Sequence, residues 1–205
     1  MAWMNLVMAV TALSAAVAMR PWRGMTSEHA PWPWLAALVL MPVLWSADRA
    51  VQSAMVQPLS AACLLMLMCG WPLGVLALGL VTLLTWWLGD LQAAEALRRG
   101  VWLGIVPATI AMAAGAGIRR WLPAHLMVYI LGRGFFATLL ANALARAADL
   151  TLHDVGSTLT GGELMVGRWL ASWADALITG MLTAVFVAFR PQWLATYADR
   201  LYLPR

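Results

Sequence analysis

The sequence predicts an all-α fold, a polytopic transmembrane helical bundle of about seven helices, one of them short or re-entrant. Composition is the first observation behind this prediction. Hydrophobic residues make up 63% of the 205 residues and charged residues 11%, against roughly 45–50% and about 25% in soluble domains. The mean hydropathy of +0.79 is the second observation. A soluble globule of this length could not bury so much apolar surface, so we expect residues 1–205 to form a single transmembrane domain without a soluble domain.

The third observation is that apolar segments recur at lengths near the roughly 20 residues that a spanning helix needs. The seven candidates are 3–19, 34–54, 58–70, 72–89, 100–118, 124–147 and 165–189. The first carries no charged residue, and the second has the full length of a span.

The third and fourth segments form one apolar run that only Gly70, Trp71 and Pro72 interrupt. Glycine and proline can end one helix and start another. Because segment 58–70 is short for a span, we expect a tight hairpin or a partly re-entrant piece. Non-helical backbone at membrane depth is tolerated only when it is buried in protein.

The last three segments differ in composition. The fifth is dense in glycine and alanine, which let helices approach closely. The sixth and seventh carry charged side chains inside apolar stretches. The polar stretch 149–164 is expected to be an external loop, and residues 190–205 an interfacial end.

Arginine placement predicts the orientation, because cytoplasmic loops of membrane proteins carry an excess of basic residues. With seven helices, one side of the membrane carries seven arginines and the other side three. The seven are Arg20, Arg23, Arg119, Arg120, Arg190, Arg200 and Arg205. We therefore expect the N-terminus outside and the C-terminus in the cytoplasm.

Three charged side chains inside the predicted spans are candidate functional residues. A charge in the membrane costs about 2.5–3.5 kcal/mol on insertion scales, and is therefore usually paired and often functional. Asp175 lies well inside the seventh segment, with Arg168 nearly two helical turns earlier on the same face. Arg133 lies inside the antiparallel sixth segment, between Gly132 and Gly134. At similar expected depth, Asp175 and Arg133 are predicted to form an ion pair.

Two interpretations of these charges stay open. In one, the buried ion pair only holds two helices together. In the other, it belongs to the binding site or path of a polar substrate or ion. Asn142 and Thr138 in the sixth segment, and Thr179 one turn after Asp175, would then line the site.

Other kinds of site are not expected. The three histidines, His29, His125 and His153, fall in or near three different loops, so no metal site of clustered His, Cys or carboxylate ligands is predicted. The sequence has no HExxH or GxxxxGK[ST] motif and suggests no nucleophile–base pair. We expect no enzymatic activity, no cofactor and no nucleic-acid partner.

The C-terminal part resembles a known family. Residues 173–197, WADALITGMLTAVFVAFRPQWLATY, are similar to the C-terminal helix of CbiM-type proteins, the membrane components of cobalt/nickel energy-coupling-factor transporters. Asp175 stands where the family usually has Glu, residues 176–180 match a Leu-Ile-Thr-Gly-like stretch, and Arg190-Pro191 match its Arg-Pro exit. Residues 129–144 resemble the preceding family helix. Residues 64–78 resemble its apolar run through a Gly-Pro break.

Two departures concern the family's metal ligands. Metal-capturing members have a histidine directly after the initiator methionine, and the amino terminus folds inward as a ligand. This chain has Ala2 there. A second family histidine lies just before the apolar run, where this chain has Pro58, Leu59 and Ser60. Neutral imidazole is a common ligand for such ions, so the resemblance carries over the fold but not the metal site.

The resemblance implies an integral protein of the bacterial inner membrane, from a divergent proteobacterial branch of the family. It would be the substrate-binding membrane component of an ABC transporter of the energy-coupling-factor type for cobalt or nickel ions. Its partners would be the lipid bilayer, a transmembrane coupling protein and ATPase subunits. The alternative is a non-transporting assembly or scaffold subunit of a membrane complex.

Overall fold

The described part of the chain is helical, with no strand in it. The computed structural model describes residues 2–21, 32–47, 57–89, 91–153 and 160–197. In chain order the elements are α1 (Ala2–Ala18), α2 (Trp32–Trp45), α4 (Ala62–Cys69), α5 (Trp71–Leu88), α6 (Ala93–Arg99), η2 (Gly100–Ile105), α7 (Val106–Trp121), η3 (Val128–Phe136), α8 (Ala137–Leu152), α9 (Gly161–Phe189) and η4 (Pro191–Trp193).

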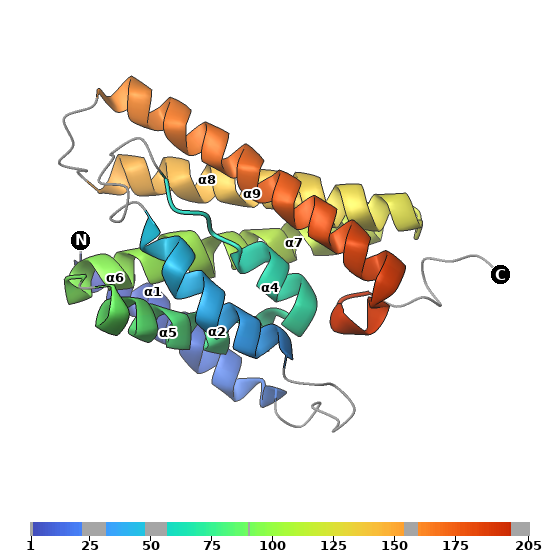
Figure 1. Ribbon diagram of the computed structural model, residues 1–205, viewed down its shortest axis with the longest axis horizontal. Helices are drawn as coiled ribbons and strands as arrows, with labels where there is room; N and C mark the ends of the chain where they lie inside the picture. Colours follow the sequence, from blue (N-terminus) through green and yellow to red (C-terminus); the bar gives the residue numbers. More distant parts are fainter. Residues whose placement is uncertain (1, 22–31, 48–56, 90, 154–159, 198–205) are drawn as a thin grey trace.

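The predicted all-α membrane bundle is confirmed (Figure 1). Among the described residues, four helical stretches are long and apolar enough to cross a membrane. They are α5, the continuous helix α6–η2–α7, the continuous helix η3–α8, and α9. The helices α1 and α2 are apolar but shorter. The second predicted segment ends earlier than expected, at Trp45, and its residues 48–54 lie outside the described ranges.

The helices pack around the short helix α4. The long helices α8 and α9 run side by side in opposite directions across the top of Figure 1. On its other side α8 packs on α7. The helix α5 contacts α1, α2 and α4. The helix α4 itself touches α2, α5, α7 and α9. The large core side chains Trp45, Leu67, Leu78 and Tyr129 are fully buried, whereas many Leu and Val side chains are exposed on the outside of the bundle.

The helix α4 is the short segment that the sequence predicts. Its eight residues rise by about 12 Å, less than the roughly 30 Å of a bilayer core. Gly70 ends it with φ 77, a conformation that glycine adopts without steric cost. Pro72 then lies in the first turn of α5, where its missing N–H is tolerated. The N-terminus of α4 lies inside the bundle, where Ser60 and Ala62 are fully buried.

The helix α9 begins earlier than the expected residue 165. Thr160 caps it, because its hydroxyl accepts from the backbone of Glu163 while the Glu163 carboxylate accepts from the backbone of Thr160. This reciprocal arrangement is a capping box. It places Asp175 at the middle of a helix of 29 residues.

Candidate functional site

Asp175 is the centre of a buried polar cluster. The residue is 3% exposed, and its Oδ2 accepts from Nη2 of Arg146 at 2.7 Å. Its Oδ1 accepts from the backbone N of Ser60 at 2.9 Å and of Ala61 at 3.4 Å. Arg146 also donates to the carbonyl of Pro58 at 2.8 Å. We call Asp175, Arg146 and residues 58–61 the Asp175 cluster.

In this cluster the side chain of Asp175 on α9 caps the N-terminus of α4. The carboxylate of Asp175 meets the free backbone N–H groups that precede α4, where the positive end of the helix dipole favours an anion. The Ser60 hydroxyl accepts from the backbone N of Ala62 and donates to the carbonyl of Leu103. Trp45 donates its Nε1 to the carbonyl of Ser60 at 3.1 Å. Residues 58–61 are thus fixed from four elements, α2, η2, α8 and α9.

Ala61 has an unusual backbone conformation at this point. Its φ of 52 and ψ of −1 place it in the left-handed region, which costs an L-residue with a Cβ about 1–2 kcal/mol. Strain of this kind persists only where the surroundings impose it. The hydrogen bonds from Ser60 and Ala61 to Asp175 supply part of that constraint.

The predicted polar side chains of the sixth segment lie next to the cluster. Asn142 is 1% exposed and donates to the Thr138 carbonyl at 3.1 Å and to the Sγ of Cys63 at 3.8 Å. Thr138 is also buried, and its hydroxyl has no hydrogen-bond partner in the described part of the chain. Thr179 is buried on α9, where its carbonyl accepts from the Thr183 hydroxyl. The structure therefore brings Asn142 and Thr138 to one face of α8 with Arg146.

Arg168 belongs to a second cluster, nearer to the end of the bundle at which α9 begins. Its Nη1 donates to Oδ2 of Asp149 and to the carbonyl of Arg146, each at 2.8 Å. Asp149 Oδ1 lies 3.1 Å from Nδ1 of His153 and 3.5 Å from Nε of Arg98. We call Asp149, Arg168, Arg98 and His153 the Asp149 cluster. Three groups able to carry positive charge surround one buried carboxylate there.

The Asp149 cluster reaches α1 through Asn5. Trp102 donates its Nε1 to Oδ1 of Asn5 at 3.0 Å, and since an indole nitrogen can only donate, this contact fixes the orientation of the amide. The Nδ2 of Asn5 then donates to Nε2 of His153 at 3.2 Å. His153 Nε2 is therefore the acceptor in this contact, and its Nδ1 faces Asp149.

The predicted ion pair of Asp175 with Arg133 is wrong. Arg133 lies toward the opposite end of α9, because Gly134 packs against Thr183 and Gly180 packs against Phe135. The segment around Arg133 is therefore level with residues 180–183, five to eight residues beyond Asp175, which is about 8–12 Å along the helix. The guanidinium of Arg133 instead packs against Gly115, over the Tyr129 ring, with Nη1 3.4 Å from the Thr196 carbonyl oxygen.

Arg146, the true partner of Asp175, was missed by the sequence analysis. It lies close to the end of the predicted segment 124–147, where an arginine is typical of the membrane interface. A signal was present, since Asn142, Arg146, Asp149 and His153 follow one another at intervals of four, three and four residues. Such spacing places side chains on one face of a helix, and all four are buried.

No ready-made metal centre accompanies these clusters. Among the described residues, no three His, Cys, Asp or Glu side chains come together in a way that could hold a metal ion. The donors next to Asp175 are backbone carbonyls, hydroxyls, the Asn142 amide and the Cys63 thiol. The Oδ2 of Asp175 is occupied by Arg146 at 2.7 Å. A cation could bind this carboxylate oxygen only if Arg146 moved away.

Comparisons with known proteins add no relative. No family model, no curated protein and no solved structure matches the chain.

Proposed function

We propose that the chain is the substrate-binding membrane component of an energy-coupling-factor transporter for transition-metal ions such as cobalt or nickel. One observation carries the proposal. Asp175 on α9, which stands where the family has an acid, is in direct contact with Ser60 before α4, 115 positions away in the chain. In the resemblance, residues 58–60 occupy the place of a family histidine that this chain lacks.

The form of α4 also supports transport. It is a half-length helix whose N-terminus lies inside the bundle, and the residues before it are not helical. In transporters, such discontinuous helices supply backbone groups and dipole ends to a substrate or ion near the middle of the membrane. Irregular backbone at that depth must be buried in protein or line a cavity. Here Trp45, Arg146 and Asp175 bind it.

Substrate binding would compete with Arg146. A cation at Asp175 would replace the guanidinium on Oδ2 and draw on oxygen donors nearby, such as the carbonyls of Pro58 and Ser60. This donor set differs from the imidazole ligands common for cobalt and nickel. We therefore expect weaker and less selective ion binding than a histidine site gives.

The proposal includes a cellular setting. The protein would reside in the bacterial inner membrane, bind a transmembrane coupling protein and ATPase subunits, and perform no chemistry itself. The described arginines at the end where α7 and α9 finish, Arg119, Arg120 and Arg190, favour that end as cytoplasmic under the positive-inside rule. Topology reporters fused after Tyr197 test this orientation. A reporter that works only in the cytoplasm should be active, and one that works only outside the cytoplasm should be inactive.

The first test is an ion titration of the purified full chain in detergent. A ligand that binds only the folded state raises apparent stability by mass action, by about 2.7 kcal/mol at 100 times its dissociation constant. We expect Co²⁺ or Ni²⁺ to give a saturable rise in Tm, which Asp175→Asn abolishes. Glu163→Gln is the matched control, because Glu163 lies on the same helix at its exposed N-terminus and should leave the ion response unchanged.

Two results would contradict the proposal. One is the absence of a saturable shift with any of Co²⁺, Ni²⁺ and Zn²⁺. The other is a shift that Asp175→Asn preserves. Co-expression with a coupling protein and ATPase pair gives a second readout, in which transporter subunits should co-purify with the chain.

A second candidate function is a non-transporting assembly or scaffold subunit. The specific observation in its favour is that Asp175 and Asp149 are both paired inside the chain, at 2.7 and 2.8 Å, and that these ion pairs join α8 to α9. Buried ion pairs of this kind can serve only to fix how helices pack. An unchanged Tm in all ion titrations, together with stable co-purification of an unrelated membrane complex, would favour this function.

A further inference from the structure

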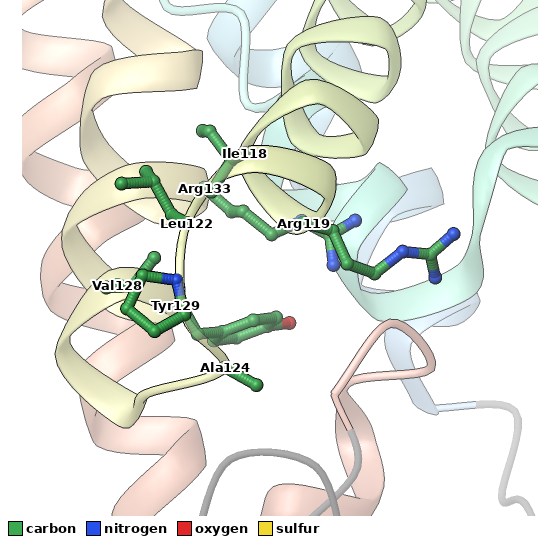
Figure 2. Close-up of a pocket in the computed structure, with 8 residues that line it drawn as sticks. Ile118, Arg119, Leu122, Ala124, Val128, Tyr129 and Arg133 are labelled. Atoms are coloured by element: carbon green, nitrogen blue, oxygen red, sulfur yellow. The ribbon is translucent and has the colours of Figure 1, made fainter.

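A pocket opens at the end of the bundle away from the Asp149 cluster. It lies where α7 ends and the next helix begins, and its volume is about 210 Å³. In Figure 2 the side chains of Arg133 and Tyr129 extend from η3 in the same direction, while Arg119 comes from the end of α7. That volume is enough for a group of several heavy atoms, since liquid water takes ~30 Å³ per molecule.

Arg133 is incompletely bonded in this pocket. A guanidinium has five N–H donors, and within the described ranges Arg133 makes one long hydrogen bond, at 3.4 Å, to the Thr196 carbonyl. Its Nε is buried and has no acceptor among the described residues. The Tyr129 ring lies 5.5 Å from Cζ, so a cation–π contact holds the side chain in place. A buried donor without an acceptor is costly, so an anion that accepts from the other donors of this guanidinium would offset part of that cost.

The surroundings of the pocket are positive. Arg119 lines it, and Arg120 and Arg190 lie at the same end of the bundle. The carboxylates in the described ranges, Glu95, Asp149, Glu163 and Asp175, all lie on contacts elsewhere. Glu95, Asp149 and Asp175 pair with other arginines, and Glu163 caps α9. The N-terminus of the long helix that contains η3 and α8 also borders the pocket, where helix dipoles favour anions.

The pocket also has an apolar side that suits a lipid. Ile118, Leu122 and Val128 line it beside the arginines. Trp121 is 83% exposed next to it, and tryptophan is enriched at the membrane–water interface. Basic pockets between transmembrane helices bind anionic lipid headgroups. A free anion would use the arginines but gain nothing from the apolar wall.

We propose that the pocket of Arg133, Arg119 and Tyr129 binds the phosphate of an anionic phospholipid headgroup. The phosphate oxygens accept from the guanidinium of Arg133, which can bind them with two parallel N–H bonds. Arg119 adds a second charge from α7. The acyl chains run along the exposed apolar faces of α7 and η3. This site is independent of the proposed transport function.

The test measures lipid binding by the full chain in a neutral detergent. Short-chain phosphatidylglycerol, phosphatidylcholine and inorganic phosphate are titrated separately, with Tm and lipid retention in native mass spectrometry as readouts. We expect a saturable response to phosphatidylglycerol that is at least tenfold weaker in Arg133→Gln and about fivefold weaker in Arg119→Gln. Arg119 is exposed, so Arg119→Gln remains informative if Arg133→Gln folds poorly.

Arg120→Gln is the matched control. Arg120 adjoins Arg119 and is also exposed, but it does not line the pocket. If Arg120→Gln and Arg119→Gln weakened the response to phosphatidylglycerol equally, the response would reflect general surface charge, and the proposal would be overturned. An equal response to phosphatidylcholine would overturn the preference for anionic headgroups. A response to inorganic phosphate as strong as to phosphatidylglycerol would overturn the assignment to a lipid.

Discussion

At the scale of single residues, Asp175 has two structural roles at once. It is the partner of Arg146 and the cap of α4. Removing one partner of a buried ion pair usually costs about 3–5 kcal/mol, because the other charge stays buried and uncompensated. The capping bonds add about 1 kcal/mol more. A change at Asp175 therefore alters both the α8–α9 contact and the segment before α4.

Ala61 gives a prediction at the same scale. We expect Ala61→Gly to raise the free energy of unfolding by about 0.5–1 kcal/mol. Relief of ~1–2 kcal/mol of left-handed strain exceeds the ~0.5–1 kcal/mol that glycine costs in chain entropy. Denaturation of the purified protein in detergent micelles measures the change.

Ala62→Gly is the control for this change. Ala62 is the first residue of α4, so glycine there relieves no strain and should lower stability by roughly 0.5–1 kcal/mol. Equal losses in both variants would show that the left-handed conformation of Ala61 stores no strain.

The partner of Asp175 could not be deduced from residue positions. Asp175 and Arg133 each lie about ten residues after the start of their predicted segments, and these antiparallel segments start on opposite sides of the membrane. Such positions coincide in depth only when both helices span about 20 residues, and α9 spans 29. The charged residue itself was predictable, because an acid in an apolar stretch is costly. Its partner depends on the offset between α8 and α9, which the small contacts at Gly134 and Gly180 set.

At the scale of helices, glycines on one helix leave the space that long side chains of neighbouring helices occupy. A Cβ at Gly115 would lie 2.8 Å from Nε of Arg133, and one at Gly104 would lie 3.0 Å from the Trp45 ring. The dense small residues of the fifth predicted segment therefore admit side chains of other helices from the same chain. Sequence alone predicts that this helix packs tightly, but not which neighbours it receives.

One buried amide, that of Asn5, adds a polar contact to the packing of α1 on α5, α6 and η2. Asn5 is 2% exposed and bonds both Trp102 and His153. We expect Asn5→Ala to lower the free energy of unfolding by about 1–3 kcal/mol, because two buried polar groups lose their partner. Hydrogen exchange should rise first in α1, since that helix loses its polar anchor.

Ser14→Ala is the control on the same helix. Ser14 is exposed, and its hydroxyl bonds only the local carbonyl of Thr11, so its loss should change stability by less than about 0.5 kcal/mol. If Asn5→Ala behaved like Ser14→Ala, the Asn5 contacts would not anchor α1.

At the scale of the whole molecule, the polar groups divide between two ends. The Asp149 cluster, with Asn5, lies toward the end where α1 and α9 begin, and its arginines are paired with carboxylates. The end where α7 and α9 finish carries Arg119, Arg120, Arg133 and Arg190, which have no carboxylate partner in the described ranges. The Asp175 cluster lies between these ends, at the middle of α9. This distribution separates the proposed substrate site from the proposed lipid site.

The sequence predicted the helical fold, the short third segment and the buried acid, because each depends on residues close together in the chain. Apolar length predicts helices, and Gly70-Trp71-Pro72 marks the break between α4 and α5. The contact of residues 58–61 with Asp175 was not accessible, since it joins backbone groups to a side chain far along the chain. Nothing in the residue types of Pro58, Leu59 and Ser60 indicates that their backbone receives a carboxylate and a guanidinium.

The central claim is that Arg146, and not Arg133, balances Asp175. A double-mutant cycle in detergent tests it most directly, with unfolding free energies measured for Asp175→Ala, Arg146→Ala and the double variant. We expect the two single changes to be strongly destabilising, and the double variant to be more stable than their sum predicts by at least ~1 kcal/mol. In the parallel cycle of Asp175→Ala with Arg133→Ala, the effects should add to within about 0.5 kcal/mol. Additive effects with Arg146, or rescue by Arg133→Ala, would contradict the account.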